Sequence, residues 1–227
     1  MINFGGASLL FNKDGQVRLN PSDTIEEGWY PYPVQTLYSA DGRTLTVPQT
    51  EVEAHLQVGW YVRPVRTLYA ADGRSIIVFE KDLEQWLAVG WYLTDVRAEA
   101  IAKVTQSDIA DLANVMHSEA NGLDTREVSM IAWCVLNRVD ANQGSIHSIC
   151  WSNQFTRRGN TTAYAWLAED VLIRWYMEKA GVTNVGRTLP STHRYFVGDG
   201  VHNYFRADFN GKGELYSIFN NYPNPYV

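Results

Sequence analysis

The sequence predicts an α+β chain: three small ββα repeats in residues 1–98, then a mainly helical domain with a small β-hairpin in residues 99–227. The tripeptide Gly-Trp-Tyr recurs at a constant spacing of 31 residues, beginning at Gly28, Gly59 and Gly90. Long stretches with helical periodicity appear only in the second part, and a turn-rich aromatic segment follows them. With 227 residues and 45% hydrophobic content, the chain can bury the cores of two small domains.

The three repeats share one order of local signals. An apolar stretch runs into Asp-Gly, which suits a tight hairpin turn, and a second short apolar stretch follows it. A helical stretch comes next and ends at the glycine of Gly-Trp-Tyr. The first copy is four residues shorter between Asp-Gly and Gly-Trp-Tyr than the other two.

A unit of about thirty residues buries little surface alone, so neighbouring repeats are expected to stack. The favoured interpretation of the Trp-Tyr pairs is a core between repeats; the alternative is an exposed aromatic platform for a ligand. The repeats are acidic overall. Their expected role is either attachment to a cell wall or self-association, and the sequence does not separate the two.

Charge and composition exclude several classes of protein. The net charge of −6 argues against nucleic acid as a partner. No apolar run reaches membrane-spanning length, and the first residues do not resemble a signal peptide. Cys134 and Cys150 show no metal-ligand spacing, so we expect buried free thiols, and neither a metal nor another cofactor is expected.

A single glutamate, Glu119, stands out near the end of the first predicted helix of the second part. The helix is expected over residues 108–120, with Ser107 as its N-cap. At 100° per residue, Glu119 projects into the middle of the apolar stripe. A carboxyl group on that side is uncommon and needs a reason. It is either a general acid or a group that caps local structure or pairs with a buried arginine.

Two more helices are expected behind it. Residues 130–136 are apolar all round, which predicts a central helix, and Asp124 with Glu127 resembles a capping box at its start. A long amphipathic helix is predicted over residues 163–179, with Gly181 as its stop. The residues expected to face the core there are Trp166, Leu167, Leu172 and Trp175.

Two further segments place aromatic rings beside side-chain amides. One is Gln154-Phe155; the other is the predicted hairpin of residues 194–206, which carries Tyr195, His202, Asn203 and Tyr204. Rings that stack on sugar C–H surfaces and amides that bind hydroxyl groups suit a glycan. The same residues suit a small sheet packed on helices equally well.

Taken in order, "VMHSEANG", "VSMIAWCVLNRV", "NQFT" and "YFVGDGVHNYFR" resemble the SleB/CwlJ cell wall hydrolase family, the spore-cortex-lytic enzymes with their phage and bacterial relatives. The resemblance covers about residues 106–208. It implies a lysozyme-like fold and cleavage of the MurNAc–GlcNAc bond of peptidoglycan glycan strands, with Glu119 as the catalytic glutamate. One departure is clear: Leu123 and Asp124 stand where many members carry a second acid.

With one acid in place, the favoured activity is that of a lytic transglycosylase, in which the muramyl C6 hydroxyl replaces the missing nucleophile. A hydrolysing muramidase would need Asp124, Asp199 or a positioned water instead. The alternative of another class is a non-catalytic wall-binding or phage structural protein on a degenerate lysozyme-like scaffold. The expected place of action is the bacterial cell wall, as a phage endolysin or a virion-associated protein whose release route is open.

Overall fold

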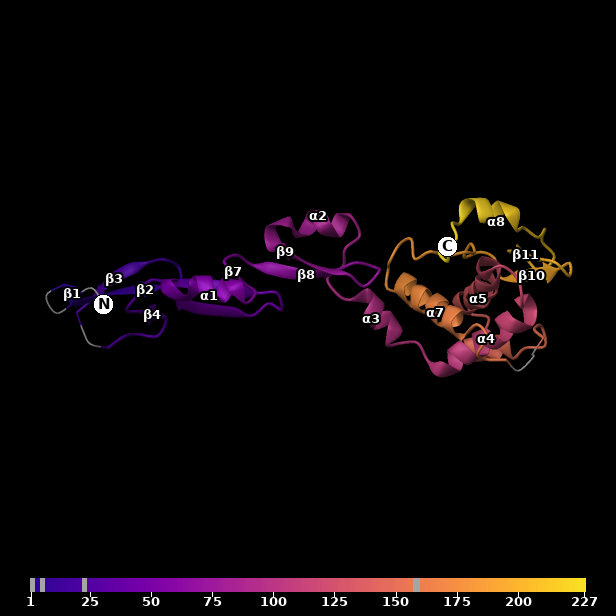
Figure 1. The fold of residues 1–227 in the computed structure, drawn as a ribbon, viewed down its shortest axis with the longest axis horizontal. Helices are drawn as coiled ribbons and strands as arrows, with labels where there is room; N and C mark the ends of the chain where they lie inside the picture. The colour runs from indigo at the N-terminus through magenta and orange to yellow at the C-terminus, as the bar shows by residue number, and fades with distance from the viewer. Residues whose placement is uncertain (1–2, 5–6, 22–23, 157–159) are drawn as a thin grey trace. The chain divides into compact units, whose positions relative to one another are not determined.

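A computed structural model describes residues 3–4, 7–21, 24–156 and 160–227. The chain divides into two compact units, Met1–Asp95 and Val96–Val227. The first unit consists of short antiparallel strands with two short helices, whereas the second is mainly helical with one hairpin (Figure 1). The fold is therefore mixed α+β. The helix α3 (Val96–Ile101) opens the second unit, a few residues before the predicted start at residue 99.

Each repeat of the first unit begins with an antiparallel hairpin. In the second and third repeats a 3-10 turn and a short helix follow the hairpin, so the predicted ββα order is confirmed there. No helix follows in the described part of the first repeat, where the connection is shorter. The paired strands are β2 (Ala7–Asn12) with β3 (Val17–Asn20), β5 (Val34–Ser39) with β6 (Thr44–Pro48), and β8 (Val65–Tyr69) with β9 (Ser75–Phe79). The helices are α1 (Val52–Gln57) and α2 (Leu83–Ala88), after the turns Gln49–Glu51 and Glu80–Asp82, and β1 (Asn3–Phe4) adds an edge strand to β2.

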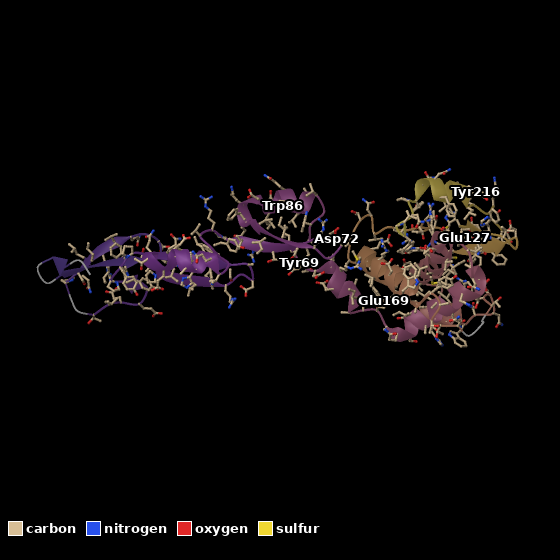
Figure 2. The ribbon with its side chains drawn as sticks, in the orientation of Figure 1. Tyr69, Asp72, Trp86, Glu127, Glu169 and Tyr216 are labelled. Atoms are coloured by element: carbon tan, nitrogen blue, oxygen red, sulfur yellow. The ribbon has the colours of Figure 1, made fainter. Side chains whose placement is uncertain are left out.

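The Trp-Tyr pairs return to the first strand of their own repeat. The short strand β4 (Trp29–Tyr30) pairs with β2, and β7 (Trp60–Tyr61) pairs with β5. In the third repeat Tyr92 forms an isolated bridge with Tyr69, a residue labelled in Figure 2.

The expectation that these pairs form a core between repeats is wrong. All six aromatic residues are only partly buried. Their ring contacts also stay within a repeat: the Arg18 guanidinium lies 4.1 Å from the ring centroid of Trp29, and Trp86 packs edge-on against Trp91 at 5.7 Å. The buried residues of the repeats are instead aliphatic side chains of the hairpins, such as Leu10, Leu37 and Leu68.

In the second unit one helix is packed against three others. The helix α5 (Thr125–Asp140) packs against α4 (Gln106–Ala120), α6 (Ile146–Cys150) and α7 (Ala165–Lys179). Residues 127–138 of α5 are all buried, which confirms the predicted central helix. The hairpin of β10 (Tyr195–Gly198) and β11 (Asn203–Arg206) follows α7, as predicted, and α8 (Tyr216–Asn221) lies near the chain end.

Three local predictions need correction. Thr105, not Ser107, caps α4: its backbone is extended and its side chain accepts a hydrogen bond from the Asp108 N–H at 3.1 Å. Asp124 does cap α5, but Glu127 is turned inward and does not complete a capping box. Trp166 is 56% exposed rather than in the core, because it sits in the first turn of α7 and packs edge-on against Tyr226.

No helix in the described part of the chain is long and apolar enough to cross a membrane. Cys134 and Cys150 are both free and buried, as predicted. Burial raises the pKa of both thiols, that of Cys134 to about 12.

Candidate active site

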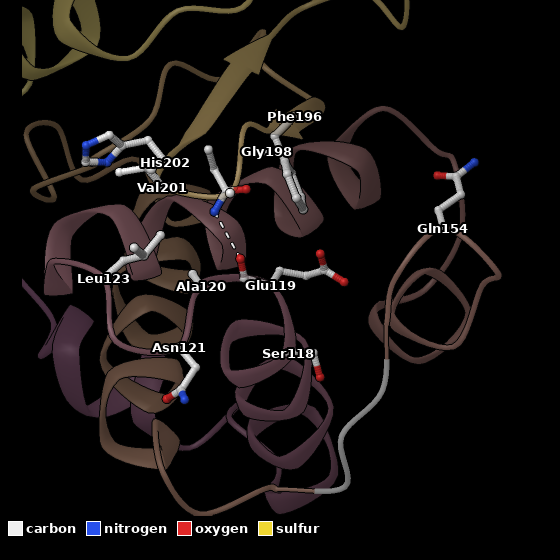
Figure 3. A pocket seen from close by; sticks show the side chains of 12 residues that line it. Ser118, Glu119, Ala120, Asn121, Leu123, Gln154, Phe196, Gly198, Val201 and His202 are labelled. Carbon is white, nitrogen blue, oxygen red and sulfur yellow. Dashed lines mark hydrogen bonds between the residues drawn. The ribbon is translucent and has the colours of Figure 1, made fainter.

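Glu119 lies in the last turn of α4, on the side of the helix that carries the buried residues Leu112, Val115 and Met116. At this end the packing opens, so the Glu119 side chain is partly exposed. Its carboxylate extends into a cleft of about 420 Å³ (Figure 3). The residues that line the cleft are Ser118, Glu119, Ala120, Asn121, Leu123, Gln154, Phe196, Gly198, Gly200, Val201, His202 and Asn203.

Hydrogen bonds hold Glu119 at both its main chain and its carboxylate. The Asn203 side chain, on the hairpin, donates from Nδ2 to the main-chain oxygen of Glu119 at 3.0 Å. The main-chain N–H of Thr156 donates to Oε1 of Glu119 at 2.5 Å. Three segments distant in sequence therefore meet around Glu119: the end of α4, the loop after α6, and the hairpin (Figure 3).

A second glutamate, Glu127, fixes the hairpin by hydrogen bonds, a role that the sequence does not predict. It is 1% exposed and lies on α5 (Figure 2). Its Oε1 accepts a hydrogen bond from the main-chain N–H of Asn203 at 2.6 Å, and its Oε2 lies 3.0 Å from Nδ1 of His202. The sequence signal for this role is the position of Glu127, an acidic residue immediately before an otherwise apolar helical stretch.

The structure brings four of the seven predicted site residues into one cleft: Glu119, Gln154, His202 and Asn203. Gln154 is exposed, whereas Asn203 is 4% exposed. The other three lie outside the lining of this cleft. Phe155 and Tyr195 line an adjoining cavity, and Tyr204 hydrogen-bonds Asp199, which raises the pKa of the phenol.

The two sequence candidates for a second acid are engaged elsewhere. Asp124 accepts a hydrogen bond from the Arg126 N–H at the start of α5. Asp199 accepts from the N–H groups of His202 and Val201 in the hairpin turn, and these bonds lower its pKa. Among the described residues that line the cleft, Glu119 alone carries a carboxyl group. The arrangement therefore offers one carboxyl group as proton donor and acceptor, surrounded by amides, main-chain groups and the His202 imidazole.

Residues 3–4, 7–21, 24–156 and 160–227 contain no group of three His, Cys, Asp or Glu side chains arranged to hold a metal ion. Compared with protein-family models, curated proteins and solved structures, the chain finds no match. The functional assignment therefore depends on the geometry of the cleft and on the motifs that build it.

Proposed function

We propose that the second unit cleaves the MurNAc–GlcNAc glycosidic bond of peptidoglycan, with Glu119 as the catalytic acid and base. The observation that carries this proposal is the position of Glu119: a carboxyl group fixed by the Thr156 N–H at an open cleft lined otherwise by uncharged polar, glycine and apolar groups and by His202. The resemblance of residues 106–208 to the SleB/CwlJ family supports the same site and a lysozyme-like fold.

The chemistry needs one proton to move in each of two steps. Glu119 first donates a proton to the glycosidic oxygen as the bond to the muramyl C1 breaks. The carboxylate then accepts the proton of the muramyl C6 hydroxyl while that oxygen bonds to C1. The products are two shorter strands, one of which ends in a 1,6-anhydro-muramyl residue. Glu119 is regenerated in its acid form.

The single carboxyl group favours this lytic transglycosylase route over hydrolysis. Most glycoside hydrolases place two carboxyl groups about 5 to 9.5 Å apart across the scissile bond. Here Asp124 and Asp199 hold main-chain N–H groups and do not line the cleft. A substrate hydroxyl as nucleophile removes the need for a second acid.

The walls of the cleft suit a sugar. Gln154 and His202 supply groups that can bind hydroxyls, and the Phe196 ring projects from the hairpin toward the cleft (Figure 3). Gly200 has a φ of +93° in the hairpin turn, a conformation that favours glycine and keeps this part of the rim free of a side chain.

Analysis of the ends formed on purified sacculi tests the proposal. The full chain and Glu119→Gln are incubated with sacculi, and the released muropeptides are separated and identified by mass spectrometry. Anhydro ends formed by the parent chain alone support the transglycosylase. Free reducing ends would identify a hydrolysing muramidase, and no new ends from either chain would reject an enzyme in favour of a non-catalytic wall-binding or phage structural protein.

For the first unit we propose attachment to the cell wall, with self-association as the competing role. The repeats are acidic, so attraction between opposite charges does not explain contact with an anionic wall. Their partly exposed Trp-Tyr pairs offer ring faces for stacking on sugars instead. Such a protein would act at the bacterial wall as an endolysin or a virion-associated component.

A further inference from the structure

A second cavity, of about 290 Å³, adjoins the Glu119 cleft and has a different chemistry. Gln154 and Phe196 line both spaces, so a ligand that extends past them from the cleft enters this cavity. Three arginines, Arg138, Arg194 and Arg206, line it together with aromatic rings. We call it the arginine cavity; its remaining lining residues are Gln154, Phe155, Tyr195, Phe196 and Phe209.

The three guanidinium groups have no acidic partner. None of them lies within 4.0 Å of a carboxylate in the described part of the chain. Arg138 is 8% exposed, and its Nε donates to Oε1 of Gln143 at 3.1 Å. The Nε atoms of Arg194 and Arg206 are buried without a hydrogen-bond partner among the described residues.

Such an arrangement is costly unless something compensates it. Arg138 is buried, and Arg194 and Arg206 are half-buried. Partly desolvated charges without partners are disfavoured, and like charges that lie close together repel. Arg194 and Arg206 meet at the open end of the hairpin, where the Arg194 N–H donates to the main-chain oxygen of Arg206 at 3.1 Å. Two other arginines of the second unit are paired with carboxylates, Arg174 with Asp170 and Arg187 with Glu178. At the arginine cavity, by contrast, three guanidinium groups without a carboxylate partner among the described residues line one space.

The aromatic walls define what the cavity can bind. The Arg138 guanidinium lies 5.7 Å from the ring centroid of Phe155 and 5.8 Å from that of Tyr195, and Arg206 lies 5.7 Å from that of Phe209. Rings at this distance restrict the guanidinium groups and exclude water, which strengthens their attraction for an anion. Planar guanidinium groups match a carboxylate with two parallel hydrogen bonds.

We propose that the arginine cavity binds a carboxylate of the peptidoglycan strand whose sugars occupy the Glu119 cleft. The identity of this ligand rests on the proposed function. Peptidoglycan offers two sources of the same chemistry: the carboxylates of the peptide stem, and the lactoyl carboxylate of muramic acid where the stem has been removed. Chitin oligomers have the same sugar backbone and neither carboxylate.

Calorimetric titration of the full chain carrying Glu119→Gln measures binding without consuming the ligand. The three ligands are a glycan tetrasaccharide with peptide stems, the same glycan after stem removal, and chitotetraose. At least one of the two carboxylate-bearing glycans should bind more tightly than chitotetraose, and added salt should reduce the difference. The tighter of the two identifies the source of the carboxylate, whereas equal binding of all three ligands would overturn the proposal.

Variants then connect the binding to the arginines. Arg194→Gln and Arg206→Gln should each weaken binding of the carboxylate ligand roughly tenfold, the scale of one charge-assisted hydrogen bond, and leave chitotetraose binding unchanged. Lys212→Gln is the matched control, because it removes the same charge from an exposed position outside the cavity. Arg194→Lys keeps the charge but not the planar geometry and should lose only part of the affinity.

Two results would contradict the assignment: unchanged binding of the carboxylate ligand in both glutamine variants, or an equal loss for chitotetraose. Circular dichroism on the same samples, together with Arg194→Lys, separates lost binding from lost folding. The sacculus digestion measures the proposed activity independently of these binding titrations. A chain that binds the carboxylate but forms no new glycan ends would support the cavity and reject the enzyme.

Discussion

The side-chain amide of Asn203 donates to the main-chain oxygen of Glu119, and the main-chain N–H of the same residue donates to Oε1 of Glu127. Asn203 therefore joins a buried glutamate to the glutamate of the cleft. Carbonyl groups in the last turn of a helix lack helical partners, so the bond to Glu119 also satisfies the end of α4. The position of the hairpin and the position of the acid are set together.

Replacing Glu119 by Gln should abolish most activity. The amide keeps the shape of the side chain but cannot donate an acidic proton, so turnover of sacculi should fall at least about a hundredfold. Glu119 is partly exposed, so thermal unfolding should change little. The matched control is Glu169→Gln, which alters an exposed carboxyl group on α7 and should keep full activity. Wild-type turnover by the Glu119 variant would falsify the assignment.

Gln154 and Asn203 both line the cleft, yet truncation should affect them differently. Gln154 is exposed, so Gln154→Ala should weaken activity and leave unfolding unchanged. Asn203 is buried and bonded to the end of α4, so Asn203→Ala should lower the free energy of unfolding by about 1 to 2 kcal/mol as well. Parallel measurement of turnover and of urea midpoints separates the two. Equal loss of stability in both variants would contradict the assigned positions.

Glu127→Ala should be the more damaging change to the fold. It leaves the Asn203 N–H and the His202 imidazole without their buried acceptor, at a cost of about 2 to 4 kcal/mol. Guanidinium unfolding gives the loss, and activity should fall with it because the hairpin wall shifts. Glu127→Gln, which retains one carbonyl oxygen for the Asn203 N–H, should recover part of the stability. A neutral Glu127→Ala would show that the hairpin is held by other contacts.

The local signals in the sequence predicted α5 and the hairpin correctly because both are encoded within a few residues. The sequence predicts Glu127 as a capping residue because it lies three positions after Asp124, which is the spacing of a capping box. Its actual partner is Asn203, far along the chain, and no local pattern contains that distance. The Trp-Tyr strands were missed for the same reason: they pair with strands about 20 residues earlier.

The candidate site was predicted in outline for a similar reason. Helical periodicity placed Glu119 on the packed side of α4, and the structure shows that side opening into a cleft. Aromatic and amide content alone does not show that Gln154 lines the cleft and that Phe155 is packed inside. Phe155 is 7% exposed, and its ring centroid lies 6.0 Å from that of Phe196. Whether a residue lines the cleft or the arginine cavity depends on how the hairpin of β10 and β11 packs against the loop after α6.

The two cysteines should resist alkylation in the folded chain. Burial raises the pKa of both thiols above the ordinary 9.0, so the reactive thiolate is scarce at pH 8. Iodoacetamide followed by mass spectrometry should label neither thiol in the native chain and both in guanidinium. Because the folded pKa values are raised, the stability that these thiols contribute is complete below pH 9.0 and declines as pH rises above it. Rapid labelling of Cys134 at pH 8 would contradict its burial.

The first unit should sediment with purified sacculi when expressed alone as residues 1–95. Contact through aromatic stacking and hydrogen bonds depends little on ionic strength, so the bound fraction should be similar at low and high salt. Trp60→Ala should reduce it, and Glu53→Gln, on an exposed position of α1, is the control. A folded circular dichroism spectrum without sedimentation at either salt concentration would favour self-association, which sedimentation velocity then measures.

Each Trp-Tyr segment pairs with the first strand of its own repeat. The strand pairing within a repeat therefore does not depend on the number of repeats. A duplication or deletion of 31 residues in frame with the repeat leaves every remaining strand with its partner. Gain or loss of whole repeats is therefore expected to leave both the strand pairing of the first unit and the fold of the second unit unchanged.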